Sequence, residues 1–140
     1  MPIELTKVAY TTAASAKGGR AGHVTSADGV IDLDLAYPGT PGDPKANPET
    51  LFAAGYAACF QNALTNRART QGVDTSDSTV TAQVSFGPSE DGCFGLAVDI
   101  SVEIPGVQSA RAQELVELAH QYCPYSKATR GNITVTVGVV

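Results

Sequence analysis

Charged residues are scarce in this sequence, and the basic ones are outnumbered by the acidic ones. Lys and Arg together number 9 against 14 Asp and Glu, which gives a net charge of −5. A chain without a basic excess is poorly suited to bind nucleic acid or an anionic membrane surface. Charged residues make up only 16% of the chain against 43% hydrophobic ones, which indicates a folded chain. So low a charged fraction also hints that part of the surface is covered in an oligomer.

Long apolar runs, targeting segments and cofactor motifs are also missing. The longest apolar run, residues 51–60, is too short to cross a bilayer. The N-terminus MPIELTKVAY has no signal-peptide pattern. No glycine-rich nucleotide motif is present, and the two histidines and three cysteines lack the paired spacing of a zinc site. We therefore expect a cytoplasmic protein without a membrane segment, a cofactor or a bound metal.

Hydrophobic periodicity predicts an α+β fold with the order β-β-β-α-β-β-α-β, in a single domain that spans residues 1–140. Residues 37–48 are rich in proline and glycine and are expected to form an irregular loop. A short turn or helix is expected to begin at Pro124. The predicted helices cover residues 48–71 and 109–122, and the predicted strands cover residues 3–13, 22–26, 30–35, 78–86, 94–104 and 132–140.

The first predicted helix has a clear beginning and an unusual composition. Asn47 suits the N-cap, Pro48 suits the first helical position, and Glu49 favours the positive end of the helix dipole. The run LFAAGYAACF that follows is apolar on every side, which is typical of a buried helix. Its small residues would let another backbone pack closely against it.

Two cysteines are candidates for redox chemistry. Cys59 lies midway along the apolar helix, where a free cysteine usually behaves as a small hydrophobic residue. A reactive thiol there would need a positive charge nearby and a second thiol. Cys123, just before Pro124, offers that thiol, and at the start of a helix its own thiolate would be favoured by the helix dipole. Cys93, in a hairpin-like stretch, is interpreted as a bystander. The residues alone do not bring Cys59 and Cys123 together.

Arg20 and Glu49 are candidate partners of such a thiol. Arg20 lies among glycines in KGGRAG; it is either a solvated loop residue or a guanidinium brought close to a site. Glu49 either matches the helix dipole or clamps Arg20 in a bidentate pair. Ten residues separate Glu49 from Cys59, about 15 Å along one straight helix. An Arg20–Glu49 pair that serves Cys59 would therefore need a helix break near Gly55, a long reach by Arg20, or a second chain.

Four segments resemble the organic hydroperoxide resistance (Ohr) branch of the OsmC/Ohr family: YTTAASAKGGRAG, SADGVIDLDLA, NPETLFAAGYAACF and HQYCPYSKATRGNITV. The resemblance implies an intertwined homodimer in which antiparallel sheets are wrapped around two long central helices. It implies that Cys59 is the peroxidatic cysteine and Cys123 the resolving cysteine. It also implies that Arg20 stabilises the Cys59 thiolate and that Glu49 positions Arg20.

The function implied by the resemblance is reduction of organic (alkyl or fatty-acid) hydroperoxides to alcohols. The reaction would pass through a Cys59 sulfenic acid and a Cys59–Cys123 disulfide, recycled by a dithiol such as the lipoyl group of a carrier protein. An apolar pocket would favour such substrates over hydrogen peroxide, and its expected lining is Phe52, Tyr56, Phe60 and Tyr125. The alternatives are an OsmC-type peroxidase with a broader substrate range, a non-catalytic dimer that binds apolar ligands, and a thiol-based redox sensor.

Overall fold

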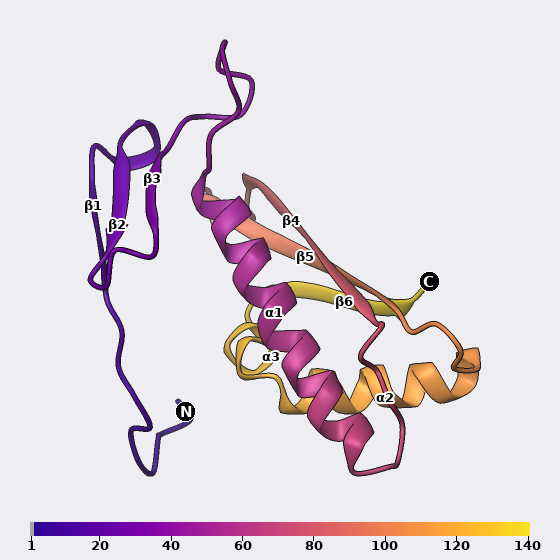
Figure 1. Cartoon of the computed structure of the whole chain (residues 1–140). Helices are drawn as coiled ribbons and strands as arrows, with labels where there is room; N and C mark the ends of the chain where they lie inside the picture. Colours follow the sequence, from indigo (N-terminus) through magenta and orange to yellow (C-terminus); the bar gives the residue numbers. More distant parts are fainter. Residues whose placement is uncertain (1) are drawn as a thin grey trace. The chain divides into compact units, whose positions relative to one another are not determined.

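The computed structural model describes residues 2–140, which divide into two compact units (Figure 1). The first unit ends at Pro48, and the second comprises Glu49–Val140. The elements are mixed α and β, as predicted. The prediction that residues 1–140 form a single domain stays a prediction.

The first unit contains a small antiparallel sheet in the order β1-β2-β3. The predictions over residues 22–26 and 30–35 are confirmed, although β3 is shorter than expected. The strand predicted over residues 3–13 is wrong, because β1 begins only after the end of that range. Residues with high strand propensity need a neighbouring strand to pair with, and the apolar side chains of this segment are instead exposed. The elements are β1 (Ala14–Lys17), the 3-10 turn η1 (Gly19–Ala21), β2 (His23–Ser26) and β3 (Asp32–Asp34).

His23 links two strands of this sheet through both of its ring nitrogens. It lies opposite Asp34 in the register of β2 and β3. Its Nδ1 lies 2.7 Å from an Asp34 carboxylate oxygen, and its Nε2 lies 2.5 Å from an Asp32 carboxylate oxygen. The hydrogen bond to Asp34, and then the one to Asp32, raise the pKa of His23 above its ordinary value. His23 in turn lowers the pKa of Asp34.

The two histidines are therefore expected to titrate on opposite sides of the ordinary imidazole pKa of about 6.5. The pKa of His23 is raised by its carboxylate partners, whereas burial lowers the pKa of His120. The hydrogen bonds of His23 therefore stabilise the folded state fully when the pH is below the pKa that His23 has in the unfolded chain. This stabilisation is lost as the pH rises through the higher pKa that His23 has in the folded state. An NMR titration of both rings measures this directly, with Asp34→Asn expected to lower the pKa of His23. A His23 that titrates below His120 would contradict the prediction.

The second unit holds two long helices, a short helix and a three-stranded sheet. The helix predicted over residues 109–122 is confirmed, and the one predicted over residues 48–71 ends two residues early. The short helix expected at Pro124 is present as α3, so the second unit has one helix more than the predicted order. The elements are α1 (Pro48–Arg69), β4 (Thr79–Pro88), β5 (Phe94–Glu103), α2 (Ser109–Tyr122), α3 (Pro124–Thr129) and β6 (Thr134–Val139).

The sheet of this unit is mixed, with the order β4-β5-β6. β4 and β5 form an antiparallel hairpin, but β6 pairs with β5 in parallel. The expectation of purely antiparallel sheets therefore needs a correction here. The reason is the connection: the chain leaves β5, passes through α2 and α3, and returns in the same direction, as a helical crossover requires.

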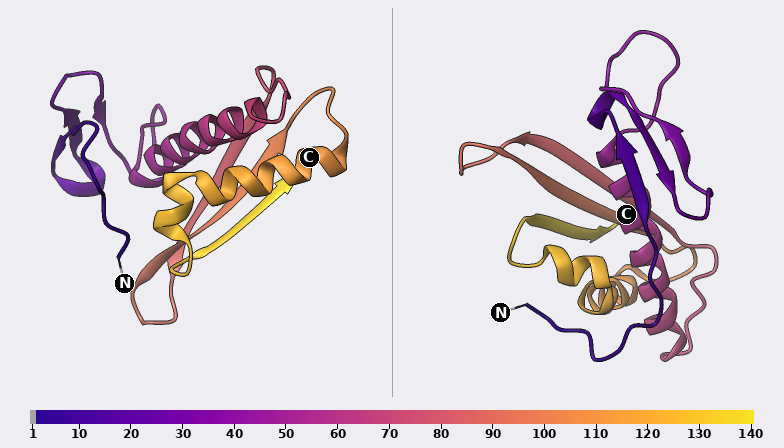
Figure 2. Two further views of the ribbon diagram at one scale, coloured as in Figure 1. Left: turned by 90° about the horizontal axis from the view of Figure 1, so that it is seen from below. Right: turned by 90° about the vertical axis from the view of Figure 1, so that its left-hand side faces the viewer.

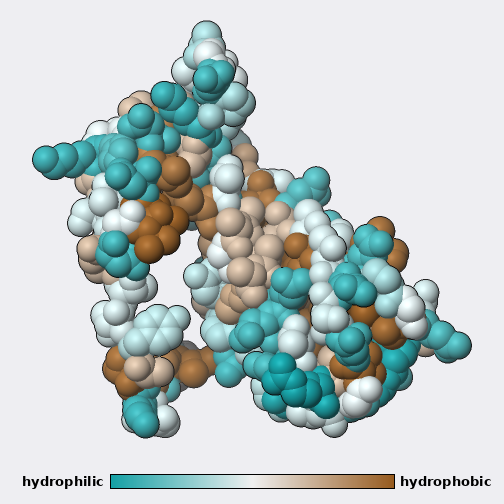
Figure 3. Space-filling view, viewed as in Figure 1, coloured by the Kyte–Doolittle hydropathy of each residue, from teal (hydrophilic) through white to brown (hydrophobic). Residues whose placement is uncertain are grey.

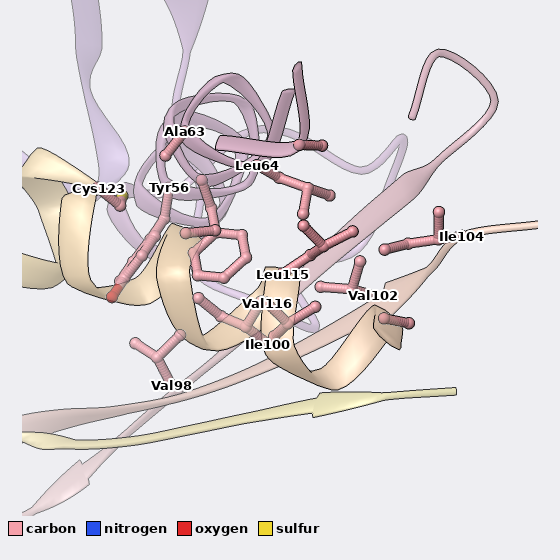
Figure 4. Close-up of a cluster of buried hydrophobic side chains, with 14 residues drawn as sticks. Tyr56, Ala63, Leu64, Val98, Ile100, Val102, Ile104, Leu115, Val116 and Cys123 are labelled. Carbon is pink, nitrogen blue, oxygen red and sulfur yellow. The ribbon is translucent and has the colours of Figure 1, made fainter. Parts of the chain in front are cut away.

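The hydrophobic core lies between the sheet and the two long helices, which cover the same face of it (Figure 2). Side chains at alternate positions of β5 point toward the helices (Figure 4). The intervening Asp99 and Glu103 of that strand are exposed, which is the alternation expected of a sheet covered on one side. The largest fully buried side chains are Tyr56, Phe60, Leu64, Ile100, Leu115, Val102 and Val116.

Helix α1 is buried along one face only. Tyr56, Phe60 and Leu64 are inaccessible to solvent, whereas Ala54 and Ala58 on the opposite face are exposed. In Figure 3 the surface over α1 is pale tan, the colour of weakly hydrophobic residues. A helix buried on every side was expected; in one copy of the chain that expectation is wrong, because the sheet and α2 cover only one side of α1.

Candidate active site

The structure brings Cys59 and Cys123 together. Their sulfur atoms lie 3.6 Å apart, and both thiols are free. Cys59 is half-buried in the middle of α1, and Cys123 is fully buried between α2 and α3. A disulfide needs a sulfur separation of about 2 Å, so a small displacement would join this pair. Residues 64 positions apart in the chain thus form a dithiol that no local sequence motif reveals.

The junction of α2 and α3 explains how Cys123 reaches this position. Cys123 has extended backbone angles (φ −63°, ψ 122°) and stands both after the last residue of α2 and before the first residue of α3. Pro124 suits the first position of a helix because it has no N–H to leave unpaired. The first N–H of α3 is therefore that of Tyr125, and it donates a hydrogen bond to the Cys59 sulfur.

The immediate surroundings of Cys59 oppose its ionisation. Burial raises the pKa of the Cys59 thiol above its ordinary value, and the neighbouring Cys123 raises it further. The hydrogen bond from the Tyr125 N–H lowers this pKa but does not reverse the balance. A reactive thiolate at Cys59 therefore requires a positive charge from elsewhere.

Gly55 allows α3 to pack closely on α1 beside the thiols. A Cβ atom at Gly55 would lie 3.3 Å from the ring of Tyr125. That ring stacks on Phe52, with centroids 6.3 Å apart, and meets Tyr56 edge-on at 5.9 Å. Three of the four predicted pocket residues thus pack against one another, but none of the four lines the groove that contains Cys59. Phe60, which is as fully buried as Tyr56, packs elsewhere: its ring lies 6.4 Å from that of His120.

A hydrogen-bond network around the buried Ser126 hydroxyl fixes the junction of α2 and α3. The Ser126 hydroxyl lies 2.8 Å from the Tyr56 hydroxyl and 2.8 Å from His120 Nδ1. The Arg130 guanidinium donates to the His120 carbonyl oxygen at 2.6 Å. Burial, and then the charge of Arg130, lower the pKa of His120, which favours a neutral ring. The sequence reasoning missed this network, because a serine in CPYS gives no sign of being fully buried.

A groove of about 260 Å³ opens beside Cys59. The Arg67 guanidinium lies 4.2 Å from the centre of the Tyr122 ring within it. The sequence analysis also missed this groove, although Asn62, Ala63, Asn66 and Arg67 follow Cys59 at helical spacing and therefore lie on one face of α1. The groove is lined by Cys59, Asn62, Ala63, Asn66, Arg67, Tyr122 and Pro124.

Arg20 lies in η1 of the first unit, in a turn that only glycines can form. Gly18 and Gly19 have positive φ angles of 79° and 60°. A Cβ atom at Gly22 would lie 1.8 Å from the Lys17 carbonyl oxygen. The glycines of KGGRAG are therefore required by the path of the loop itself. The role predicted for Arg20 at Cys59 stays a prediction.

Glu49 is the second residue of α1. The helix continues without a break past Gly55 to Arg69, so Glu49 remains about 15 Å along the axis from Cys59. Of the three routes by which an Arg20–Glu49 pair would serve Cys59, the break near Gly55 is thereby excluded. A long reach by Arg20 or a second chain remains.

Other candidates are set aside by their positions. Cys93 is exposed in the loop between β4 and β5. Within residues 2–140, no three His, Cys, Asp or Glu side chains gather in a way that would hold a metal ion. No helix among the described residues has the length and hydropathy needed to cross a membrane.

Comparison with known proteins agrees with this fold. The OsmC-like protein family model matches residues 40–138. The organic hydroperoxide resistance protein OhrA of Bacillus subtilis is 50% identical over 135 residues, which cover 93% of this chain and 95% of the relative.

Solved structures agree as well. The crystal structure of OhrB of Bacillus subtilis matches with a TM-score of 0.90 and 46% identity, over 95% of this chain and 100% of that one. The organic hydroperoxide resistance protein of Elizabethkingia anophelis matches with a TM-score of 0.87 and 50% identity, over 96% and 98% of the two chains. The chain therefore belongs to the OsmC/Ohr family, in its branch of organic hydroperoxide resistance proteins.

Proposed function

We propose that this protein is a thiol-dependent peroxidase that reduces organic hydroperoxides to alcohols. The observation that carries the proposal is the pair of free thiols with sulfur atoms 3.6 Å apart, one half-buried and one fully buried. The names of the relatives, which are organic hydroperoxide resistance proteins, support the choice of substrate class. A buried dithiol of this kind serves two-step redox chemistry, because the second thiol can trap the oxidised first one.

The reaction begins at Cys59, which is open to the groove. Its thiolate attacks the outer peroxide oxygen, the O–O bond breaks, and the alkoxide leaves as an alcohol after taking up a proton. Cys59 is then a sulfenic acid. The Cys123 sulfur attacks the Cys59 sulfur, water leaves, and a disulfide forms. An external dithiol reduces this disulfide by exchange and becomes a disulfide itself.

Arg20 and Glu49 complete the proposed site. Burial raises the pKa of Cys59, so a cation is needed to hold the thiolate near neutral pH. In the proposal Arg20 supplies this charge and faces the departing alkoxide, and Glu49 orients the guanidinium through a bidentate pair. Because α1 is unbroken, a second chain is the favoured way to unite Glu49 with Cys59.

A homodimer is part of the proposal. The exposed face of α1 carries Ala54 and Ala58, and small residues allow two helices to approach closely. The N-terminal segment leaves Leu5 and Tyr10 exposed at 78% and 84%. Both features suit a second copy that covers α1 and pairs with this segment. Exposed apolar surface of this kind usually marks an interface.

The proposed reductant is a small dithiol such as a lipoyl group, in keeping with a cytoplasmic location where protein thiols stay reduced. A dithiol closes a ring as it is oxidised, which makes the exchange with a buried disulfide efficient. The rings of Phe52 and Tyr125 stack on each other, and the backbone of Tyr125 reaches the Cys59 sulfur. Apolar rings at this place would favour an alkyl group over the small and polar hydrogen peroxide.

The test is steady-state reduction of cumene hydroperoxide with dihydrolipoamide as the electron donor. We expect fast turnover, much slower turnover with a monothiol donor, and weaker activity toward hydrogen peroxide.

Arg20→Gln is expected to slow the reaction of the reduced protein with hydroperoxide, because less thiolate is present at neutral pH. Folded, reduced wild-type protein that turns over no hydroperoxide would exclude the peroxidase and favour a ligand-binding dimer. An unaffected Arg20→Gln variant would remove only the role of Arg20.

A further inference from the structure

The groove beside Cys59 contains a cation that the proposed reaction does not use. The Arg67 guanidinium is held 4.2 Å above the Tyr122 ring, a contact that fixes the orientation of an arginine side chain. The side chains of Asn62 and Asn66 line the same groove, and its lining includes no carboxylate. A guanidinium and two amides without an acidic neighbour form a surface suited to an anion.

The spacing along α1 relates this cation to the reactive thiol. Arg67 follows Cys59 by eight residues, so it lies on the same helix face, about 12 Å along the axis. The groove of about 260 Å³ is lined by both residues. Ala63 and Pro124 also line it, and they give an alkyl chain apolar surface between the two ends.

We propose that Arg67 is a specificity-determining residue that binds the carboxylate of long-chain hydroperoxy acids. The inference rests on the proposed function and narrows its substrate class. With the peroxide group at Cys59, a hydroperoxy fatty acid lies along the groove and places its carboxylate at the Arg67 guanidinium. The net charge of the chain is −5, which disfavours anions in general, so a local cation decides whether an acid is accepted.

The test compares a linoleic acid hydroperoxide with its methyl ester in the same detergent. We expect wild-type protein to prefer the acid, and Arg67→Gln to lower the acid-to-ester ratio of kcat/KM by about tenfold, the effect of one lost charge-assisted hydrogen bond. Arg67→Lys keeps the charge and should retain part of the preference. The matched control is Arg69→Gln, which removes an exposed arginine from the same helix outside this groove.

A binding measurement supplies a second readout. The hydroxy acid product is titrated calorimetrically into Cys59→Ser protein with and without Arg67→Gln, and the second change is expected to weaken binding about tenfold. The difference should shrink at high salt because the interaction is between charges. If Arg67→Gln leaves the acid-to-ester ratio of kcat/KM unchanged, whether or not both values fall, the inference about Arg67 is wrong. Turnover of cumene hydroperoxide would still support the peroxidase. Failure of wild-type protein with every hydroperoxide would instead overturn the proposed function.

Discussion

Replacing Cys59 with serine is expected to abolish hydroperoxide reduction, with a loss of at least about a thousandfold in kcat/KM, as when a catalytic nucleophile is removed. A serine hydroxyl is a far weaker nucleophile toward peroxide oxygen and is not ionised near neutral pH. Cys59 lines the groove, whereas Cys123 is fully buried, so Cys123 cannot take over the attack. Rapid mixing of reduced protein with cumene hydroperoxide measures the first step directly.

The control for this change is Cys93→Ser. Cys93 is exposed in the loop between β4 and β5 and forms no part of the thiol pair. We expect its variant to retain wild-type activity and to consume one equivalent of hydroperoxide per chain without an added reductant. Loss of activity in Cys93→Ser together with survival in Cys59→Ser would reverse the proposed roles.

Replacing Cys123 with serine is expected to spare the first step and to disable recycling. Cys59 should still react with one equivalent of hydroperoxide, because Cys123 only raises the pKa of its neighbour. Steady-state turnover with dihydrolipoamide should fall by at least about a hundredfold, since a thiol held at contact distance acts at a far higher effective concentration than one in solution. The measurement pairs the single-turnover burst with the steady-state rate.

Mass spectrometry distinguishes a loss of recycling in Cys123→Ser from inactivation by misfolding. In Cys123→Ser protein, Cys59 should accumulate as sulfenic and then sulfinic acid, whereas wild-type protein should show the Cys59–Cys123 disulfide. Because Cys123 is buried, circular dichroism must show that the serine variant is folded. Full steady-state activity in the folded variant would mean that the disulfide is not part of the cycle.

Much of the fold follows from local patterns in the sequence. The two long helices, α1 and α2, were predicted to within two residues, because proline and glycine mark their ends and their apolar residues recur at helical spacing. The hairpin β4–β5 was equally clear from its alternation. The strand expected over residues 3–13 was wrong, since a strand depends on a partner that sequence periodicity does not supply. The parallel pairing of β6 depends likewise on where the crossover returns the chain.

By itself, the sequence determined the mixed fold class, the apolar helix with Cys59 at its centre and the turn at Cys123-Pro124, because each depends on residues close together in the chain. It also determined the family, through four segments spread along the chain. Only the tertiary structure decided that the sulfur atoms of Cys59 and Cys123 lie 3.6 Å apart. It also decided that burial and Cys123 raise the pKa of Cys59, although the Tyr125 N–H lowers it, and that Arg67 lines the same groove as Cys59. These properties depend on packing α1 against α2 and α3, and no local pattern specifies how distant segments meet.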